Sequence, residues 1–126
     1  NIDLKQVDLN SEKLPYKNEF FDNACFVAAL HCIESKQGRE KALKELYRVL
    51  KKNGKVFLSV WSENHSRVKN NIKHQRLPWS AGLNDKKYFR FYYIYDEQEI
   101  KSLVEKIGFK ILDIKENDNL VLILEK

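Results

Sequence analysis

The fold is decided by KELYRVLKKNGKVFLSVW, the stretch from Lys44 to Trp61. With the residues just before it, this stretch predicts an amphipathic helix over residues 37–50, because its apolar side chains recur at the spacing of one helical face. Asn53-Gly54 is predicted to supply the left-handed residue that ends the helix. The apolar run over residues 55–61 predicts a buried strand, so a helix leads directly into a strand of an α/β sheet.

Four further elements are predicted on either side of this stretch. Asp96, followed by Glu99 three residues later, predicts the start of a helix that ends before Gly108. Strands are expected at residues 3–9 and 23–29, and a terminal hairpin at residues 109–115 and 120–125. Alternating strands and helices predict a mostly parallel three-layer α/β sheet with an antiparallel terminal hairpin.

Length and composition exclude several classes of protein. The chain has 126 residues, of which 43% are hydrophobic and 33% charged, as in one globular domain. No apolar run is long enough for a membrane helix, and a cytoplasmic location is expected. Cys25 and Cys32 are predicted to be buried reduced thiols. The three histidines show no ligand spacing with the cysteines, so no metal site is predicted.

The order of short motifs resembles the second half of a class I S-adenosylmethionine (SAM) methyltransferase. The motifs are LPY at Leu14, FD at Phe21, LHCI at Leu30, ELYRVLKKNG at Glu45 and VW at Val60. The family binds SAM with a glycine-rich loop after its first strand, whereas the four glycines here, Gly38, Gly54, Gly82 and Gly108, are far apart. The chain is therefore interpreted as the C-terminal half of one methyltransferase domain, lacking strands one and two. The strands are then expected in the order four, five, seven, six, with residues 3–9 set apart as strand three.

A closer resemblance is to the tRNA wobble-uridine 5-carboxymethyl methyltransferases. VWSEN at Val60 is similar to their VWA-x-EQ motif, RFYYIY at Arg90 to the segment before their last helix, and NDNL at Asn117 to their RDNW ending. The resemblance implies methyl transfer from SAM to a carboxymethyl group on wobble uridine. It also implies tRNA as a partner, with a small zinc-binding activator protein. The sequence departs from the family pattern at Cys32, Asn64, Tyr93 and Leu120, which leaves the substrate more open than the reaction class.

The same resemblance implies roles for individual residues. Asp8 and Leu9 would hold the adenine of SAM, or else Asp8 only starts a turn. Ala28 and Ala29 would leave room for the methyl-donor end, or else pack in the core. His31 would face the catalytic pocket, or else be a packed histidine. Arg90 is the candidate for orienting the substrate carboxylate, with Tyr92 or Tyr93 shaping the pocket; the catalytic set is His31, Arg90 and Tyr93.

A local excess of positive charge indicates a polyanionic partner. Residues 64–90 carry seven basic side chains against Asp85 alone, interleaved with aromatic residues, and are expected to form a basic insertion or lid spanning about residues 62–90. Within it, four residues are predicted to bind RNA phosphates: Arg67, Lys69, Lys73 and Arg76. Three alternatives stay open: a solvated loop without a partner, a small-molecule SAM methyltransferase, and a non-catalytic RNA-binding or scaffold module.

Overall fold

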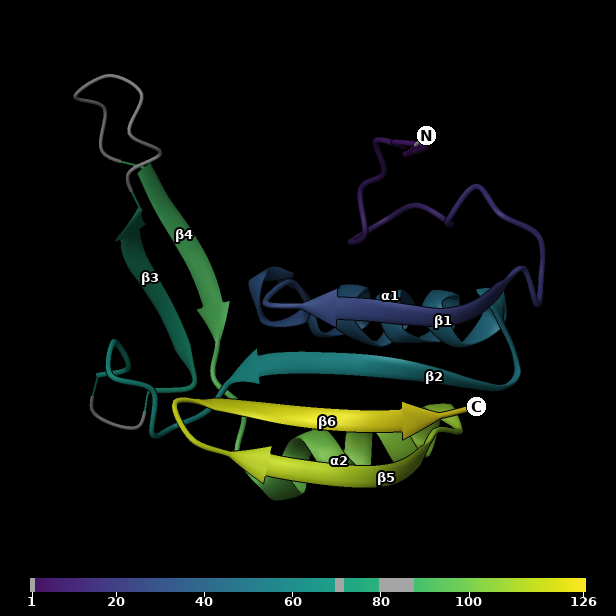
Figure 1. Ribbon diagram of the computed structural model, residues 1–126. Helices are drawn as coiled ribbons and strands as arrows, with labels where there is room; N and C mark the ends of the chain where they lie inside the picture. Colours follow the sequence, from purple (N-terminus) through teal and green to yellow (C-terminus); the bar gives the residue numbers. More distant parts are fainter. Residues whose placement is uncertain (1, 70–71, 80–87) are drawn as a thin grey trace.

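The computed structural model describes residues 2–69, 72–79 and 88–126, and its elements are drawn in Figure 1. Part of the expected lid, residues 80–87, lies outside this range. In chain order the elements are β1 (Phe21–Val27), the 3₁₀ turn η1 (Leu30–Cys32), α1 (Lys36–Val49), β2 (Leu50–Trp61), β3 (His74–Trp79), β4 (Tyr88–Tyr93), α2 (Glu97–Ile107), β5 (Lys110–Glu116) and β6 (Asn119–Glu125). The first, second, fifth and sixth strands form one sheet, and β3 and β4 form a separate two-stranded ribbon.

The sheet has the topology that the sequence predicts. Its order is β1-β2-β6-β5, which corresponds to strands four, five, seven and six of the class I methyltransferase sheet. β1 runs parallel to β2, whereas β6 is antiparallel to both β2 and β5. The terminal hairpin is therefore confirmed, with Asn117 and Asp118 as its turn. The expectation of a mostly parallel sheet is wrong for the described residues, where the β1–β2 pairing is parallel and the other two pairings of this sheet are antiparallel.

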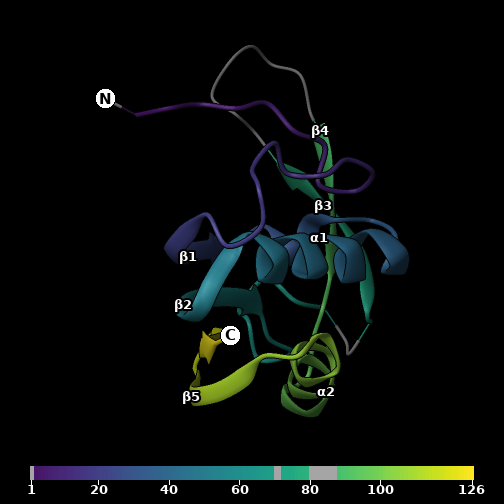
Figure 2. The same ribbon diagram turned by 90° about the vertical axis from the view of Figure 1, so that its right-hand side faces the viewer.

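Both long helices pack on the same face of the sheet, as Figure 2 shows from the side. The core between them contains alternate side chains of β2 and β6, such as Leu58 and Leu122, packed against Leu43 of α1 and Ile100 of α2. On the opposite face, Val27 is 54% exposed and Phe57 40%. Within the described residues the fold thus supplies two of the three expected layers, one of helices and one of strands.

The helix boundaries follow from identifiable caps. The hydroxyl of Ser35 accepts a hydrogen bond from the Gly38 amide at 2.9 Å and begins α1. Asp96 caps α2 by accepting from the Glu99 amide at 2.8 Å, and Gly108 ends that helix with a φ of 119°. Both predictions for α2 are confirmed. A side chain at Gly108 would be strained, because only glycine adopts this conformation readily.

The predicted helix over residues 37–50 is confirmed to within one residue, but the role given to Asn53-Gly54 in ending it is wrong. The helix ends at Val49, and β2 begins at the next residue. The pairing of β1 with β2 jumps from Phe21–Leu50 to Asn23–Lys55, so the intervening residues of β2 form a bulge. Asn53 is the left-handed residue of this bulge, with a φ of 63°. Gly54 serves close packing instead, since a Cβ there would lie 2.7 Å from the Asp22 carbonyl oxygen.

The expected strand at residues 3–9 is also wrong. This segment is irregular and pairs with no strand among the described residues, and Leu4 is 85% exposed. An extended segment without a neighbour has no partners for its backbone N–H and C=O groups, so a strand is not stabilised. The segment ends in a turn, where the Asp8 carbonyl accepts from the amides of Ser11 and Glu12.

Two further expectations need correction. Cys25 is exposed, because it lies on the uncovered face of the edge strand β1, whereas Cys32 is half-buried. Residues 62–90 are not a plain polar insertion: they contain β3 and the first half of β4, and the two strands pair in register from His74–Tyr93 to Trp79–Tyr88. No helix in the described part of the chain is long and apolar enough to cross a membrane.

Candidate active site

The carboxyl end of β1 opens the candidate site. Here Ala28 has a φ of 50°, and its amide donates to the Ser59 carbonyl at 3.1 Å on the neighbouring strand β2. Ala28 is exposed and Ala29 half-buried, so the two residues that follow β1 both have small side chains. In open α/β sheets, ligands bind outside the carboxyl ends of the parallel strands. The backbone at Ala28 therefore leaves an accessible position where such a ligand would lie.

His31 lies just beyond this edge and is 1% exposed. Its ring stacks at 5.5 Å from Trp61 and 5.7 Å from Tyr92, and its Nδ1 accepts a hydrogen bond from the Trp61 amide at 3.4 Å. Burial lowers the pKa of His31 to about 4, helped by the positive charges of His65 and Arg90 nearby. His31 is therefore neutral at pH 7, and its imidazole is fixed by packing.

Trp61 is the centre of an aromatic stack at the end of β2. Its ring lies 4.2 Å from that of Tyr92, nearly parallel at 5°, and 3.8 Å from that of His65 at 14°. The Arg67 guanidinium lies 5.7 Å from the same ring. Trp61 is half-buried. It packs against a small hydrophobic cluster formed by Leu77, Tyr92 and Ile94 and also reaches the surface. The two faces of its ring are covered within the stack, by Tyr92 and His65.

Arg90 approaches this stack from strand β4. Its guanidinium lies 4.3 Å above the ring of Trp79 and is exposed, and no carboxylate in the described part of the chain forms an ion pair with it. Burial raises the pKa of the Cys32 thiol, and the nearby Arg90 charge partly offsets that rise. Arg90 thus lies next to the turn that carries His31 and Cys32, and its in-plane N–H groups face no acid there.

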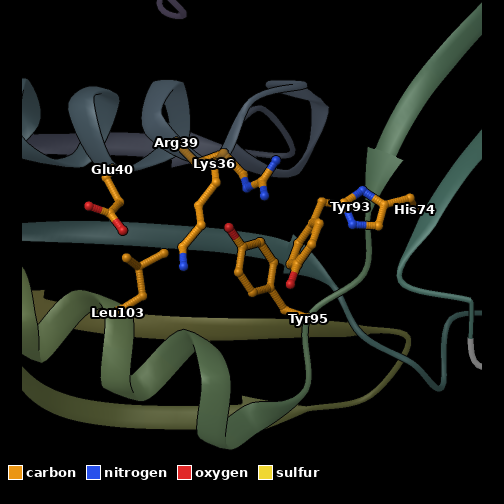
Figure 3. Close-up of a pocket in the computed structure, with 7 residues that line it drawn as sticks. All are labelled: Lys36, Arg39, Glu40, His74, Tyr93, Tyr95 and Leu103. Atoms are coloured by element: carbon orange, nitrogen blue, oxygen red, sulfur yellow. The ribbon is translucent and has the colours of Figure 1, made fainter.

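The structure does not place Tyr93 with the other two catalytic candidates. Successive residues of a strand point to opposite faces, so Arg90 and Tyr92 share one face of the ribbon and Tyr93 lies on the other. The Tyr93 hydroxyl donates to Glu99, and the Arg39 guanidinium stacks 4.0 Å above its ring (Figure 3). Tyr92 is therefore the tyrosine beside His31. The period-2 alternation of a strand would have indicated this, had β4 been recognised.

The cofactor candidates near the start of the chain form a tight turn. The Asp8 carboxylate accepts hydrogen bonds from the Asn10 amide at 2.9 Å and the Ser11 hydroxyl at 2.6 Å, which lower its pKa. Asn10 accepts from the Ser35 hydroxyl at 2.7 Å, which holds the turn against the start of α1. Asp8 is exposed and Leu9 half-buried against the core. The turn and Ala28 thus lie at the same edge of the sheet.

The four predicted RNA-binding residues differ in how free their charges are. Lys73 forms ion pairs with Asp96 at 2.8 Å and Glu99 at 3.0 Å, and Arg76 forms one with Glu34. The Arg67 side chain donates to the Pro78 carbonyl at 3.1 Å. In the described ranges, Arg67 and Lys69 have no carboxylate partner. These two can bind a polyanion without leaving a carboxylate, whereas Lys73 would have to leave two.

Comparison with known proteins decides the family. A model described as "Methyltransferase domain" matches residues 2–114. The chain belongs to the methyltransferase domain family. This methyltransferase domain is 34% identical over 125 residues to a protein of Encephalitozoon cuniculi named as a methyltransferase, covering 90% of the chain and 57% of that relative. It is 45% identical over 49 residues to the tRNA (carboxymethyluridine(34)-5-O)-methyltransferase of Arabidopsis thaliana, covering 39% of the chain and 12% of that enzyme.

Solved structures identify the fold of this methyltransferase domain. A SAM-dependent methyltransferase from Methanosarcina mazei superimposes with a TM-score of 0.75 at 19% identity, covering 97% of this chain and 66% of that one. The 1,6-didemethyltoxoflavin-N1-methyltransferase of Burkholderia thailandensis, solved with S-adenosylhomocysteine, gives 0.66 at 15% identity, covering 95% and 48%. The fold is that of class I SAM-dependent methyltransferases. The chain spans a little over half the length of its Encephalitozoon relative, 57%.

Proposed function

We propose that this methyltransferase domain uses SAM to methylate a carboxymethyl group on the wobble uridine of tRNA. The observation that carries the proposal is Arg90, which is stacked on Trp79, exposed, and without a carboxylate partner in the described ranges. It lies beside the stack formed by Trp61 and Tyr92. An arginine held by its face keeps its N–H groups free for paired hydrogen bonds to a carboxylate. The Arabidopsis relative is named for this reaction.

The groups that are accessible at the carboxyl edge of the sheet suit the binding of SAM. Ala28 presents backbone with only a methyl side chain, and the Asp8 carboxylate is exposed at the same edge. In the proposal, Asp8 and Leu9 hold the adenine, while Ala28 and Ala29 leave room for the methyl-donor end. SAM would supply an electrophilic methyl group at that edge. The residues of this chain supply binding and orientation.

The proposed methyl transfer needs little acid–base catalysis from the protein. A carboxylate ionises near pH 4 and is nucleophilic at pH 7, so no general base is required. His31 suits this, because its lowered pKa, about 4, keeps it neutral beside the substrate. In the proposal Arg90 orients the carboxylate, while Tyr92, which is 4% exposed and stacked on Trp61, shapes the pocket. Tyr93 then acts at a distance, by fixing the ribbon to α2 through Glu99.

tRNA is the proposed partner, with Arg67 and Lys69 as the phosphate contacts whose charges are free. Lys73 and Arg76 contribute less in this proposal, because each already pairs with a carboxylate. The small zinc-binding activator enters the proposal through the family resemblance alone.

The test uses the complete protein that contains this chain, SAM with a tritiated methyl group, and tRNA bearing 5-carboxymethyluridine. A methyl ester is hydrolysed by mild alkali, so the product should release volatile radioactive methanol. Arg90→Ala should lower kcat/KM about 10- to 100-fold, the value of a paired charged hydrogen bond. Arg67→Ala should instead weaken tRNA binding and flatten its log–log salt slope by about one unit.

Two outcomes would point to the alternatives. Alkali-stable methylation of a small molecule, such as a quinone precursor, without transfer to tRNA, would favour a small-molecule methyltransferase. The UbiE quinone-biosynthesis methyltransferase of Vibrio cholerae is 27% identical over 115 residues, covering 82% of this chain and 43% of that enzyme. Salt-dependent tRNA binding without any methyl transfer would favour an RNA-binding or scaffold module.

A further inference from the structure

A cavity lies on the face of the ribbon opposite to Arg90. It has a volume of about 190 Å³ and is bounded by α1, the β3–β4 ribbon and α2. Figure 3 shows its lining side chains converging from these separate elements. The lining residues are Lys36, Arg39, Glu40, His74, Tyr93, Tyr95 and Leu103. None of the roles proposed for methyl transfer uses this cavity directly.

Arg39 brings a buried positive charge to the cavity. The residue is only 4% exposed. Its Nη1 donates to the carbonyl oxygens of Ile33 at 2.8 Å and Glu34 at 2.9 Å. Its planar face lies 4.0 Å above the Tyr93 ring. No carboxylate in residues 2–69, 72–79 and 88–126 forms an ion pair with it. Buried charges are ordinarily paired, so an uncompensated guanidinium here indicates a missing anion.

The Tyr95 hydroxyl is a second, independent observation. Tyr95 is 1% exposed, and its Oη has no hydrogen-bond partner within the described residues. Buried hydroxyls nearly always have a partner. Figure 3 shows this hydroxyl turned into the cavity, toward the side chains of Lys36 and Arg39. It is therefore a donor aimed at the same space as the unpaired guanidinium.

The remaining charges around the cavity leave it positive. Lys36 is the first residue of α1, where the helix dipole also favours an anion. Glu40 is engaged by Lys106 at 3.3 Å. Glu99, behind Tyr93, accepts from the Tyr93 hydroxyl and pairs with Lys73 at 3.0 Å. Glu40 is thus paired with Lys106, and Glu99 shares Lys73 with Asp96, whereas Lys36 and Arg39 have no carboxylate partner among the described residues.

We propose that this cavity binds a phosphate-type oxyanion, held by Arg39, Lys36 and the Tyr95 hydroxyl. Each of the three supplies a donor, and the arginine and lysine supply the charge that an oxyanion needs. Because the lining comes from α1, the ribbon and α2, a bound anion would fasten the ribbon to the two helices. The oxyanion is either free phosphate or a phosphate group of bound RNA. Binding of free phosphate is independent of the methyl-transfer substrate, whereas binding of an RNA phosphate rests on the proposed tRNA partner.

The test measures binding of inorganic phosphate to the complete protein, by thermal shift at constant ionic strength, with sodium chloride as the comparison salt. Phosphate should raise the melting temperature well beyond chloride. Tyr95→Phe removes only the hydroxyl and should weaken phosphate binding about 10-fold. Lys36→Gln should weaken it by a similar factor. Lys44→Gln, an exposed lysine of the same helix, is the matched control and should bind as the parent does.

Equal shifts with phosphate and chloride would overturn the proposal, as would unchanged phosphate affinity in both Tyr95→Phe and Lys36→Gln. Arg39→Gln is not decisive by itself, since loss of its hydrogen bonds to Ile33 and Glu34 could unfold the helix start. A competition experiment then distinguishes the sources. If inorganic phosphate displaces tRNA from the parent but not from Tyr95→Phe, the cavity holds an RNA phosphate. If phosphate binds without displacing tRNA, the ligand is free phosphate.

Discussion

At the scale of single residues, His31 shows most clearly how burial changes chemistry. Desolvation lowers its pKa from 6.5 to about 4. Above pH 6.5 the ring is neutral in both the folded and the unfolded protein, so it contributes no pH dependence. Between about pH 6.5 and 4 the unfolded chain binds a proton that the folded protein does not, so stability falls as the pH falls. The full shift corresponds to about 3 kcal/mol.

The measurement is urea unfolding between pH 7 and pH 4 for the parent and for His31→Gln. We expect the parent to lose more stability than the variant over this interval, because only the parent carries the suppressed titration. An NMR titration should show His31 unchanged down to about pH 5. A His31 signal that titrates near pH 6.5, or equal pH slopes in the two proteins, would mean that this imidazole is accessible to water.

Prediction from the sequence succeeded for residues whose role is local. The cap at Asp96 and the left-handed Gly108 each depend on neighbours within a few positions, and the structure has both. It failed for Gly54, because one of the two carbonyls that exclude a side chain there belongs to Asp22, far away in the sequence, and the other belongs to Lys51 in the bulge. Which of Tyr92 and Tyr93 lies on the same face as Arg90 could not be predicted for a related reason: it needed the strand and its register first.

At the scale of elements, α2 depends on Asp96 for two different interactions. Its Oδ1 accepts from the Glu99 amide, and its Oδ2 pairs with Lys73 at 2.8 Å. Asp96→Ala removes both and should lower the free energy of unfolding by about 1–2 kcal/mol. Asp96→Asn keeps a capping oxygen and should cost under about 1 kcal/mol. Lys101→Ala, which breaks a surface pair with Glu97, is the control and should change stability by less than about 0.5 kcal/mol.

Chemical denaturation of the three variants measures these differences directly. Equal losses for Asp96→Ala and Asp96→Asn would assign the stabilisation to the Lys73 ion pair rather than to the cap. That result would also make the ribbon more important to the fold than α2 itself, because Lys73 precedes β3 and ties the ribbon to the helix.

The elements that the sequence did not predict are those that depend on distant pairing. The helices and the terminal hairpin carry periodic apolar residues and local caps or turns. β3, in contrast, has the sequence HQRLPW, which combines charge with a proline and has no apolar alternation. It becomes a strand because β4 pairs with it across the ribbon. Residues 3–9 show the opposite case, since a strand-like sequence without a neighbour in the structure stays irregular.

At the scale of the whole molecule, the order of strands was predictable because it came from the order of motifs rather than from any one element. Both faces of the ribbon contact the rest of the molecule. One face contacts Trp61 and Cys32, and the other carries Tyr93 toward the helices. This arrangement brings the two candidate sites to opposite sides of one small element, so ligands at either site would bias the position of the same ribbon.

The whole molecule also limits how well this chain can bind SAM. The proposed contacts here are Asp8, Leu9, Ala28 and Ala29, whereas the paired-glycine loop that approaches the cofactor closely in this fold is absent from the 126 residues. We therefore expect calorimetry on the 126-residue chain to give a dissociation constant above about 1 mM, equivalent to less than about 4 kcal/mol of binding free energy.

In a longer protein that carries such a loop, SAM should bind more tightly, and Asp8→Ala should weaken that binding about 10-fold through loss of a charged hydrogen bond. Lys5→Ala, in the same irregular segment and exposed, should leave the affinity unchanged. Micromolar binding by the 126-residue chain would contradict this prediction, since the edge formed by Ala28 and the Asp8 turn would then hold the cofactor without the loop.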